Sequence, residues 1–544
     1  MRYRHQRFAF VAPAELDGAS GKTRGRVPVV IVGAGPVGLA LAVDLAMHGV
    51  RSVLVDDGET VSVGSRAICW SKRTLEIFDR LGVAGRMRAK GVTWKVGRLF
   101  HRAREVYNFD LQPEPGHKHP AFINLQQYYV EEYLLDRARA FPDLIDLRFK
   151  SRLVALRNGC DGVMAEVETP AGRYELACDW LVACDGVRST ARSLLGLDLV
   201  GHTFEERFLI TDIEMKADFP SERWFWFEPP FHDGQSALLH KQPDDIYRID
   251  LQLGPDADPE VERRPENVKP RIEAIVGDRP FEIDWISVYN FQCRRLERFV
   301  HDRIVFAGDS AHIVSPFGAR GGNGGIQDAD NLAWKLAAVV RGDAPESLIA
   351  TYDEERIRAA DDNLLNSARA TSFMTPKSDI ERMFREEVLA MAATEPFARR
   401  LVNSGRLSEP YSLSGLSLQS DDDPTFASGV APGGPCPDAP VRDADGTSTW
   451  LLDHLGGDFV LMTFGKTRPA LEGVRGLAVL PAGERAGSGR EIEDRDGLVA
   501  QRYGGKAGAA YLIRPDQHIA ARFCNPDVSA ISAAMSRASG RASS

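Results

Sequence analysis

Three glycines and one carboxylate carry the first recognisable chemistry in the sequence. Gly33, Gly35 and Gly38 form a G-x-G-x-x-G turn directly after the apolar run 29–32. In such a turn the first glycine makes the bend, the second lets a pyrophosphate approach the backbone, and the third lets a helix pack on the strand. Asp56 ends a second apolar run 23 residues after Gly33, where a carboxylate can accept hydrogen bonds from ribose hydroxyls. The pattern predicts dinucleotide binding at the positive N-terminus of a helix.

Two further aspartates end apolar runs later in the chain. Asp185 and Gly186 follow one run, and Gly308 and Asp309 end another that continues into a glycine-dense turn. An aspartate at a strand end can accept a hydrogen bond from a ribityl hydroxyl, and a glycine-dense turn lets a flat ring and a phosphate approach backbone amides. Together with the first turn, these two motifs favour FAD over NAD as the bound dinucleotide.

These motifs resemble those of the class A flavoprotein aromatic hydroxylases, the fold family of para-hydroxybenzoate hydroxylase. The resemblance runs from about residue 27 to residue 400, and the branch of phenol hydroxylase and 3-(3-hydroxyphenyl)propionate hydroxylase is the most similar. It implies an α/β fold with a Rossmann-like FAD-binding domain. It also implies that the cofactor is contacted by Gly33, Gly35, Gly38, Asp56, Arg66, Gln127, Asp185, Gly186, Gly308, Asp309, Pro316, Gly321, Gly322 and Asn323.

The resemblance gives several of these residues a role. Arg66 matches an arginine that contacts the flavin, and Gln127 a glutamine near the ribityl chain. Asp185 belongs to a motif that serves both FAD and NAD(P)H, and Pro316 to a turn packed near the isoalloxazine. The segment 321–323 matches the loop that faces the pyrimidine ring.

The same resemblance implies a reaction. FAD is the bound cofactor, and NAD(P)H and O2 are co-substrates. A flavin C4a-hydroperoxide hydroxylates a phenolic or other aromatic substrate. The flavin and oxygen carry the chemistry, while the protein positions the ring and excludes water. Because only one G-x-G-x-x-G turn is visible, we expect the nicotinamide to visit the flavin rather than to reside in a domain of its own.

Substrate contacts are expected from a β-rich region. Short alternating segments over 203–290 predict a mostly antiparallel sheet, which contains the aromatic run 224–227. Aromatic residues pack well on a pleated surface, so sheet core is the alternative interpretation of that run. Polar recognition is assigned to His240, Tyr247, Arg248 and Tyr289. Tyr289 is the leading candidate, because it ends a predicted strand just before the chain returns to the flavin domain. A base or acceptor near the phenol would enrich the ring, whereas His312 is interpreted as a structural turn residue.

The order of these patterns predicts the domains. A pattern of strands followed by helices returns after the β-rich region, so the first domain is expected to be discontinuous. The expected segments are a loosely attached N-terminal arm (1–26), a FAD-binding domain with a helical extension (27–202 and 291–400), the inserted β-sheet substrate domain (203–290), a linker (401–437) and a thioredoxin-like C-terminal domain (438–544).

The net charge and the cysteines limit the kinds of binding partner that we expect. A net charge of −10 gives no reason to expect nucleic acid or an anionic membrane as partner. The seven cysteines form no C-x-x-C pair and have no metal-ligand spacing, which indicates reduced thiols in a cytoplasmic protein without a metal site. The C-terminal domain, lacking C-x-x-C, is expected to serve packing or contact in a homodimer.

Two alternatives remain open from the sequence. The stretch from Trp224 to Pro229 nearly matches the W-x-W-x-I-P text of flavin-dependent halogenases, with Glu228 in place of isoleucine. A non-catalytic flavin-fold protein that only binds and presents a ligand is the second alternative. The substrate, the site of hydroxylation and the choice between NADH and NADPH are not determined by the sequence.

Overall fold

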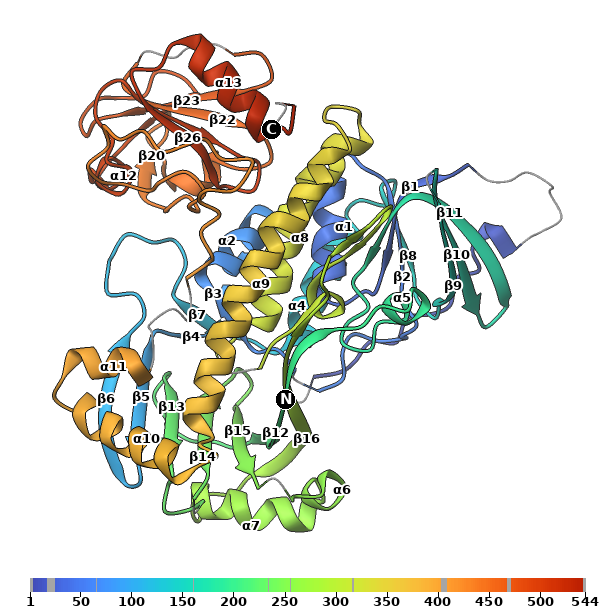
Figure 1. The fold of residues 1–544 in the computed structure, drawn as a ribbon, viewed down its shortest axis with the longest axis vertical. Helices are drawn as coiled ribbons and strands as arrows, with labels where there is room; N and C mark the ends of the chain where they lie inside the picture. The colour runs from blue at the N-terminus through green and yellow to red at the C-terminus, as the bar shows by residue number, and fades with distance from the viewer. Residues whose placement is uncertain are drawn as a thin grey trace.

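The computed structural model describes residues 3–16, 25–64, 66–159, 161–232, 234–254, 256–315, 318–402, 409–466 and 471–541. Within these ranges the chain forms three lobes, each built around a β-sheet (Figure 1). A mainly parallel sheet flanked by helices lies beside a larger, mainly antiparallel sheet, and a third sheet forms a C-terminal lobe.

The first sheet has a centre of five parallel strands, and the short β17 runs antiparallel at one edge. Its path is β17-β18-β11-β1-β2-β8, and β9 and β10 extend β11 as an antiparallel meander. Apolar runs such as 29–32 suit a strand that is covered on both faces. The bounds are β1 (Val27–Val32), β2 (Ser52–Val55), β8 (Ile145–Arg148), β9 (Arg152–Gly159), β10 (Gly162–Thr169), β11 (Gly172–Ala183), β17 (Val300–His301) and β18 (Ile304–Phe306).

Helices cover this sheet, and one of them spans most of the molecule. The long α9 descends from the first sheet to the second (Figure 1). A small sheet of order β3-β7-β4 lies between the two larger ones. The bounds are α1 (Pro36–Met47), α2 (Lys72–Arg80), α3 (Ala84–Lys90), α4 (Gln127–Ala138), α5 (Thr190–Leu194), α8 (Gly321–Val340), α9 (Ser347–Met374), β3 (Cys69–Ser71), β4 (Val92–Trp94) and β7 (Phe122–Asn124).

The second sheet has eight strands in the order β19-β16-β12-β15-β14-β13-β5-β6. It confirms an antiparallel sheet over the middle of the chain, but it also takes β5 and β6 from the segment assigned to the first domain. Strand β5 pairs parallel to β13, a long-range contact that local sequence does not encode. The bounds are β5 (Val96–His101), β6 (Arg104–Asp110), β12 (Val200–Glu214), β13 (Arg223–Phe227), β14 (Ser236–Lys241), β15 (Ile246–Leu253), β16 (Glu282–Arg295) and β19 (His312–Ile313).

Helices close both faces of the second sheet. Buried residues of α7, including Val268 and Ile272, pack against one face. The end of α9 packs with α10 and α11 against the other face, where Phe225 and Phe227 lie. The bounds are α6 (Pro259–Glu262), α7 (Pro265–Val276), α10 (Asp379–Ala392) and α11 (Pro396–Val402).

The C-terminal lobe is a seven-stranded sheet of order β21-β20-β24-β23-β22-β25-β26. Strands β22 and β23 are parallel, whereas β25 and β26 run antiparallel beside β22. The bounds are β20 (Pro440–Arg442), β21 (Ser448–Trp450), β22 (Val460–Phe464), β23 (Arg475–Leu480), β24 (Glu491–Glu493), β25 (Ala509–Ile513), β26 (Ile519–Cys524), α12 (Leu498–Tyr503) and α13 (Val528–Ala538).

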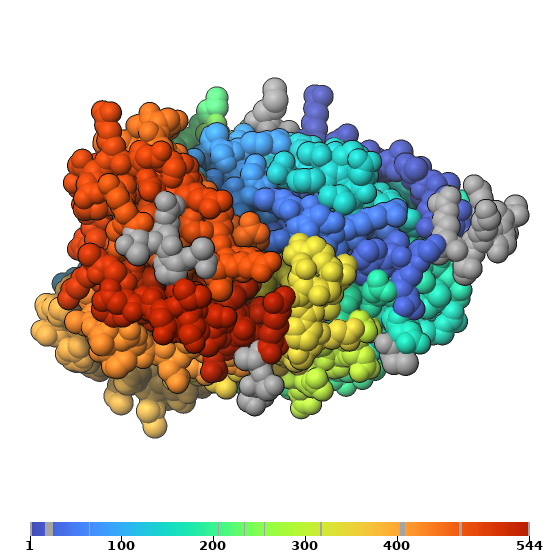
Figure 2. Space-filling view, turned by 90° about the horizontal axis from the view of Figure 1, so that it is seen from above, coloured from blue at the N-terminus to red at the C-terminus, as the bar shows by residue number. Residues whose placement is uncertain are grey.

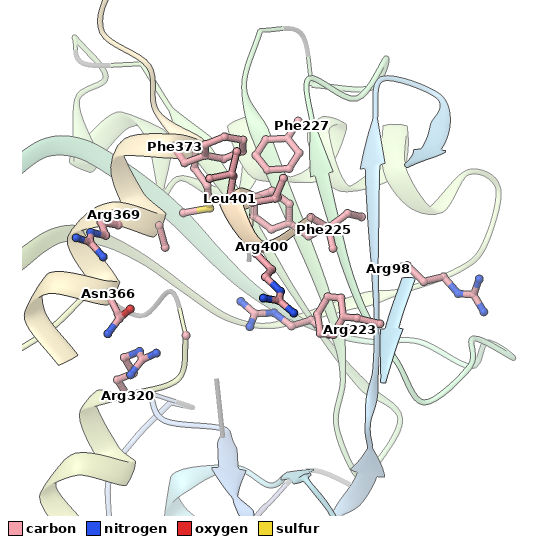
Figure 3. Close-up of a pocket in the computed structure, with 16 residues that line it drawn as sticks. Arg98, Arg223, Phe225, Phe227, Arg320, Asn366, Arg369, Phe373, Arg400 and Leu401 are labelled. Carbon is pink, nitrogen blue, oxygen red and sulfur yellow. The ribbon is translucent and has the colours of Figure 1, made fainter. Parts of the chain in front are cut away.

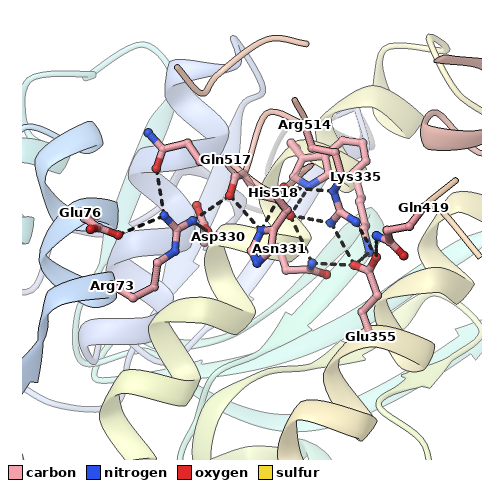
Figure 4. Close-up of polar contacts among 12 residues, drawn as sticks. Arg73, Glu76, Asp330, Asn331, Lys335, Glu355, Gln419, Arg514, Gln517 and His518 are labelled. Atoms are coloured by element: carbon pink, nitrogen blue, oxygen red, sulfur yellow. Dashed lines mark hydrogen bonds and ion pairs between the residues drawn. The ribbon is translucent and has the colours of Figure 1, made fainter. Parts of the chain in front are cut away.

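The C-terminal lobe docks on the first domain through buried charges. In Figure 2 its orange and red residues sit directly against the blue and yellow parts of the chain. Arg514 of the lobe pairs with Glu355 of α9 and with Asp516 beside it. Gln517 accepts a hydrogen bond from Arg73 of α2 at 3.0 Å (Figure 4). The lobe is thereby fastened to helices that also border the first sheet.

The N-terminal arm is packed where it is described, so its expected loose attachment is wrong for residues 3–16. Tyr3 stacks on Tyr128 with ring centroids 4.3 Å apart. Phe8 is buried, and its N–H donates to the Glu59 carbonyl at 2.7 Å. Aromatic burial holds this segment. Among the described helices, none combines the length and apolar character that crossing a membrane requires.

Candidate functional site

The first glycine turn is shaped by packing on one side and left open on the other. Gly33 has φ +106°, and a Cβ there would collide with the carbonyl of Cys184. A Cβ on Gly38 would collide with the carbonyl of Gly33. At Gly35 a Cβ would meet nothing within 4 Å. The turn therefore needs Gly33 and Gly38 for its own packing, and Gly35 keeps its outer surface clear for a ligand.

Asp56 holds this turn from the neighbouring strand. One of its oxygens accepts from the Ala34 N–H at 2.6 Å and the other from the Gly58 N–H at 2.7 Å. Burial raises the pKa of the Asp56 carboxyl, and these two hydrogen bonds oppose that shift. Carboxylate oxygens carry further lone pairs, so Asp56 can shape the turn and still accept from a ribose hydroxyl.

The three turns found in the sequence lie together. Strands β1, β11 and β18 are parallel neighbours, so their carboxyl ends share one edge of the sheet. A Cβ on Gly33 would lie 3.0 Å from Cα of Asp185, and a Cβ on Gly308 would lie 3.0 Å from Val37 of α1. Asp185 uses one oxygen to accept from the Ala191 N–H at 3.0 Å. Its other oxygen is buried and has no partner.

Asp309 is exposed to solvent even though protein surrounds it closely, as expected of a side chain that faces a cavity. Burial raises the pKa of its carboxyl, against the attraction of His312 and Arg66. Asp328 of α8 braces the adjoining turn, because it accepts from the Gly308 N–H at 2.9 Å and pairs with His312 at 2.6 Å. Sequence reasoning missed Asp328, and the structural role expected of His312 agrees with this pairing.

The N-terminus of α8 completes the sheet edge. Gly321, its first residue, would place a Cβ 3.9 Å from an Asp309 oxygen. The Asn323 side chain accepts from the Ser71 N–H at 3.0 Å and donates to the Cys69 carbonyl at 2.9 Å. Asn323 therefore ties α8 to β3, and backbone N–H groups at Gly321 and Gly322 remain to face a ligand. Pro316 lies outside the described residues.

The segment around Arg66 bridges the two larger sheets. Ala67 donates its N–H to the side-chain oxygen of Gln127 at 3.1 Å, and Gln127 in turn donates to Glu131 at 2.7 Å. The Arg66 carbonyl accepts a hydrogen bond from Arg248 at 2.9 Å. The Arg66 side chain is exposed and lies close enough to Asp309 to attract its carboxylate. Arg66 and Gln127 are therefore placed at the same edge as the glycine turns.

These features fit the cofactor that the sequence predicts. A pyrophosphate can lie over Gly35 at the start of α1, and the unpartnered oxygen of Asp185 awaits a donor. Asp309 can accept from a ribityl hydroxyl, and the positive end of α8 can face an electron-rich ring edge. The open surface at Gly35 and the unpaired buried oxygen are what an extended dinucleotide would fill.

Three of the four polar candidates for substrate contact lie on one face of the second sheet but differ in their surroundings. Arg248 forms a buried two-point ion pair with Asp212, at 2.9 Å and 3.2 Å, besides its bond to Arg66. His240 is buried, and burial lowers its pKa well below the ordinary value, so the ring is neutral. Tyr289 packs its ring against an apolar cluster that includes Phe208.

A cavity of about 380 Å³ opens beside the α8 loop (Figure 3). Its walls are formed by β5, β6 and β13 of the second sheet, by α9 and α11, and by the loop that precedes α8. The lining residues are Arg98, Leu99, Phe109, Arg223, Phe225, Phe227, Gly318, Arg320, Asn366, Arg369, Ala370, Phe373, Met374, Arg400, Leu401 and Val402. Its volume lies within the range of small-molecule sites.

His240 is connected to this cavity through a strand partner. His240 is opposite Arg223 in the β13–β14 pairing, and opposite residues in such a pair have Cα atoms about 5 Å apart. None of these three candidates is itself a lining residue, and Tyr289 packs against the apolar cluster that includes Phe225 and Phe227. The helical wall, with Arg369, was missed because no local pattern in the sequence indicates that α9 packs on this sheet.

The aromatic run divides between the two faces of β13. Phe225 and Phe227 line the cavity, whereas Trp224 and Trp226 point to the opposite face and contact Phe219 and Phe231. Alternation along a strand explains the division. The two tryptophans of the halogenase-like text therefore lie away from the cavity.

Comparison with known proteins agrees with this geometry. The model of a family described as "FAD binding domain" matches residues 26–367. A flavin-dependent monooxygenase of Mycobacteroides abscessus is 30% identical over 82% of this chain and 90% of its own. The 6-methylpretetramide 4-monooxygenase of Streptomyces rimosus is 30% identical over 94% of this chain and 92% of its own.

Two further matches connect the chain to hydroxylases. A 3-(3-hydroxy-phenyl)propionate/3-hydroxycinnamic acid hydroxylase of Mycolicibacterium smegmatis is 27% identical over 91% of this chain and 90% of its own. A crystal structure of aklavinone-11 hydroxylase with FAD and aklavinone has a TM-score of 0.76 and 26% identity, covering 96% of this chain and all of that one. These matches confirm the resemblance drawn from the sequence motifs.

Proposed function

Because the chain belongs to the FAD binding domain family, we propose that it is an FAD-dependent monooxygenase that hydroxylates a phenolic aromatic substrate in the cavity beside α8. The convergence of the Gly33, Asp185 and Asp309 turns at one sheet edge carries this proposal. The same loop that leads into α8 also forms a wall of the aromatic cavity. One ligand site and one substrate site therefore share a boundary.

Each group of residues has a share in the proposed reaction. When bound, FAD reduced by NAD(P)H supplies the activation of O2. Gly35, Asp185 and Asp309 hold the cofactor, and the backbone at the start of α8 faces its ring. Phe225 and Phe227 position an aromatic ring by stacking and keep water from it.

His240 is the best placed of the polar candidates for the substrate hydroxyl. The ring is neutral, so one of its nitrogens can accept a hydrogen bond from the phenol hydroxyl. Arg223, which lies opposite His240 on the neighbouring strand, lines the cavity. Arg248 is proposed to act by positioning, because its contacts join Asp212 to the Arg66 carbonyl. Tyr289 remains a proposed contact with the weakest support.

The two alternatives are less well supported. Trp224 and Trp226 face away from the cavity, so the halogenase-like text has a packing explanation. A protein that only presents a ligand is less well supported because the relatives are named monooxygenases and hydroxylases.

The finer assignments of the C-terminal lobe are also proposals. A thioredoxin-like domain is supported by the order β23-β22-β25-β26, with β23 parallel and β25 antiparallel to β22. None of the described cysteines forms a disulfide bond, which supports a cytoplasmic location. We also propose that the protein is a homodimer, and light scattering of the purified protein would test this.

The function is tested on purified protein. We expect a yellow protein that releases FAD on denaturation. We also expect oxygen uptake that depends on the phenol, after the oxygen lost to hydrogen peroxide has been subtracted, and a product 16 mass units heavier than the substrate. Colourless protein that cannot take up FAD would overturn the assignment. A halogenated product formed with chloride or bromide would replace it, and NAD(P)H oxidation without any modified product would favour the ligand-presenting alternative.

A further inference from the structure

The cavity beside α8 is lined by five arginines and by no aspartate or glutamate. A small-molecule pocket is usually apolar with a few polar groups. Five cations around four phenylalanines are therefore an unusual lining that calls for an explanation in terms of the ligand.

Two of the five arginines are already engaged by protein groups. Arg98 donates to Glu222 at 3.0 Å and points away from the cavity in Figure 3. Arg320 donates to Asn363 at 2.9 Å. These two side chains have structural partners that fix their orientation, so the cavity need not supply one.

The other three arginines have no such partner in the described part of the chain. Arg223, Arg369 and Arg400 come from β13, α9 and α11, and none forms a hydrogen bond or an ion pair with a carboxylate there. In Figure 3 Arg223 and Arg400 both extend toward the middle of the cavity that they line, and Arg369 and Arg400 are also solvent-exposed. Like charges brought together without an anion repel each other.

Arg223 is the most enclosed of the three. Burial lowers the pKa of its guanidinium, yet an arginine stays charged in a protein. A cation withdrawn from water without a partner is costly, and an anion that binds between the arginines offsets that cost. Asp250 lies close enough to attract Arg223, but no hydrogen bond joins them.

We propose that the substrate is an aromatic acid whose carboxylate is bound between Arg223 and Arg400, with Arg369 as a third cation. This inference rests on the proposed function, because it names the substrate class of the same cavity. The planar fork of an arginine matches a carboxylate in a two-point hydrogen bond. Phe225, Phe227 and Phe373 then enclose the rings of the acid.

Binding to the oxidised holoenzyme tests this without turnover. Two acids, anthraquinone-2-carboxylate and 3-(3-hydroxyphenyl)propionate, would each be titrated beside its methyl ester in a calorimeter, with no NAD(P)H present. We expect each acid to bind about tenfold or more tightly than its ester, because charge-assisted hydrogen bonds are lost with the charge.

Variants assign that difference to the cavity. Arg223→Gln, Arg369→Gln and Arg400→Gln should each weaken binding of the acid by about tenfold and leave the ester within about twofold. Arg382→Gln is the matched control, because it removes the same charge from the exposed face of α10. Should Arg223→Gln fold poorly, Arg223→Lys retains the charge and should bind the acid at intermediate strength.

Several outcomes would overturn the assignment of the arginines. These are equal binding of acid and ester, no binding of either acid, and full acid binding in the three variants. Displacement of the acid by NADP+ would assign the arginines to phosphate and also overturn it. If the acids bind as expected but 3-(3-hydroxyphenyl)propionate, the one phenol of the two, yields no hydroxylated product with NAD(P)H and O2, the proposed function fails while the anion site stands.

Discussion

Arg514 of the C-terminal lobe and Glu355 of α9 form a two-point ion pair that is completely buried, at 2.5 Å and 3.0 Å. Lys335 of α8 donates to the same carboxylate at 2.7 Å, and Asp516 pairs with Arg514 at 2.6 Å. Two cations and two anions thus balance in the interior (Figure 4). The pair joins the C-terminal lobe to the helix that begins at the cofactor site and to the helix that lines the cavity.

Replacing Arg514 by methionine should destabilise the protein strongly. Removal of one partner leaves a net negative charge buried at Glu355 and Asp516, and such a loss costs about 3–5 kcal/mol of unfolding free energy. Chemical denaturation followed by tryptophan fluorescence would measure it. Arg537→Met, on the exposed side of α13, is the control. A change of less than about 1 kcal/mol for Arg514→Met would contradict a structural role for this pair.

Gly35→Ala and Gly33→Ala should affect different properties. The backbone at Gly35 is extended and its surroundings are open, so alanine should leave apoprotein stability unchanged but crowd the pyrophosphate. Crowding of about 1–3 kcal/mol corresponds to roughly 5- to 150-fold in the FAD Kd. Fluorescence titration of apoprotein with FAD would measure that change.

Gly33→Ala combines a positive φ with a collision against Cys184. We expect it to lower the unfolding free energy by at least about 1–2 kcal/mol, whether or not FAD is present. If Gly35→Ala destabilised the apoprotein as much as Gly33→Ala, the surface at Gly35 would not be the open one described.

His240→Gln and Tyr289→Phe compare the two uncharged candidates. We expect His240→Gln to lower kcat by about 10²-fold, the lower end for a lost acid–base or hydrogen-bonding group, with FAD content unchanged. Tyr289→Phe removes one hydroxyl from a ring packed outside the cavity lining and should change kcat much less. The reverse ranking of the two variants would transfer the proposed role to Tyr289.

Binding of an aromatic acid should weaken as pH rises through about 6. Burial raises the pKa of Asp250 to about 6, so below that pH its carboxyl is neutral and Arg223 faces the ligand without competition. Above it, the new anion attracts Arg223 and repels the acid, which we expect to cost about fivefold in affinity. Calorimetry between pH 5 and 8 would measure the change. Asp250→Asn should remove it, and an unchanged slope in that variant would exclude Asp250 as the cause.

The cofactor site could be predicted largely from the sequence. Glycines with a required spacing, apolar runs and terminal aspartates are local signals, because a turn and its strand are encoded within a few neighbouring residues. Parallel strands in one sheet end at one edge, so the meeting of Gly33, Asp185 and Asp309 followed from strand direction alone. The family resemblance rested on those same residues.

The sequence favoured Tyr289 over His240 and Arg248 because of its place at a strand end, whereas the surroundings in the structure favour His240. All three occur in predicted β-strands with a similar alternation of polar and apolar residues, and only the residues that they pair with in the sheet distinguish their surroundings. Arg248 has Asp212 beside it across the β12–β15 pairing, His240 has Arg223, and Tyr289 has an apolar cluster. Each environment depends on strand order, which is decided by contacts distant in sequence.

By itself, then, the sequence determined the dinucleotide turns and the kind of chemistry, because these rest on short-range backbone geometry. Tertiary structure alone decided the cavity, the inclusion of β5 and β6 in its sheet, and the meeting of Arg223, Arg369 and Arg400 from three separate elements. The physical reason is that a cavity is a product of long-range packing, and charges gathered there have no local pattern along the chain.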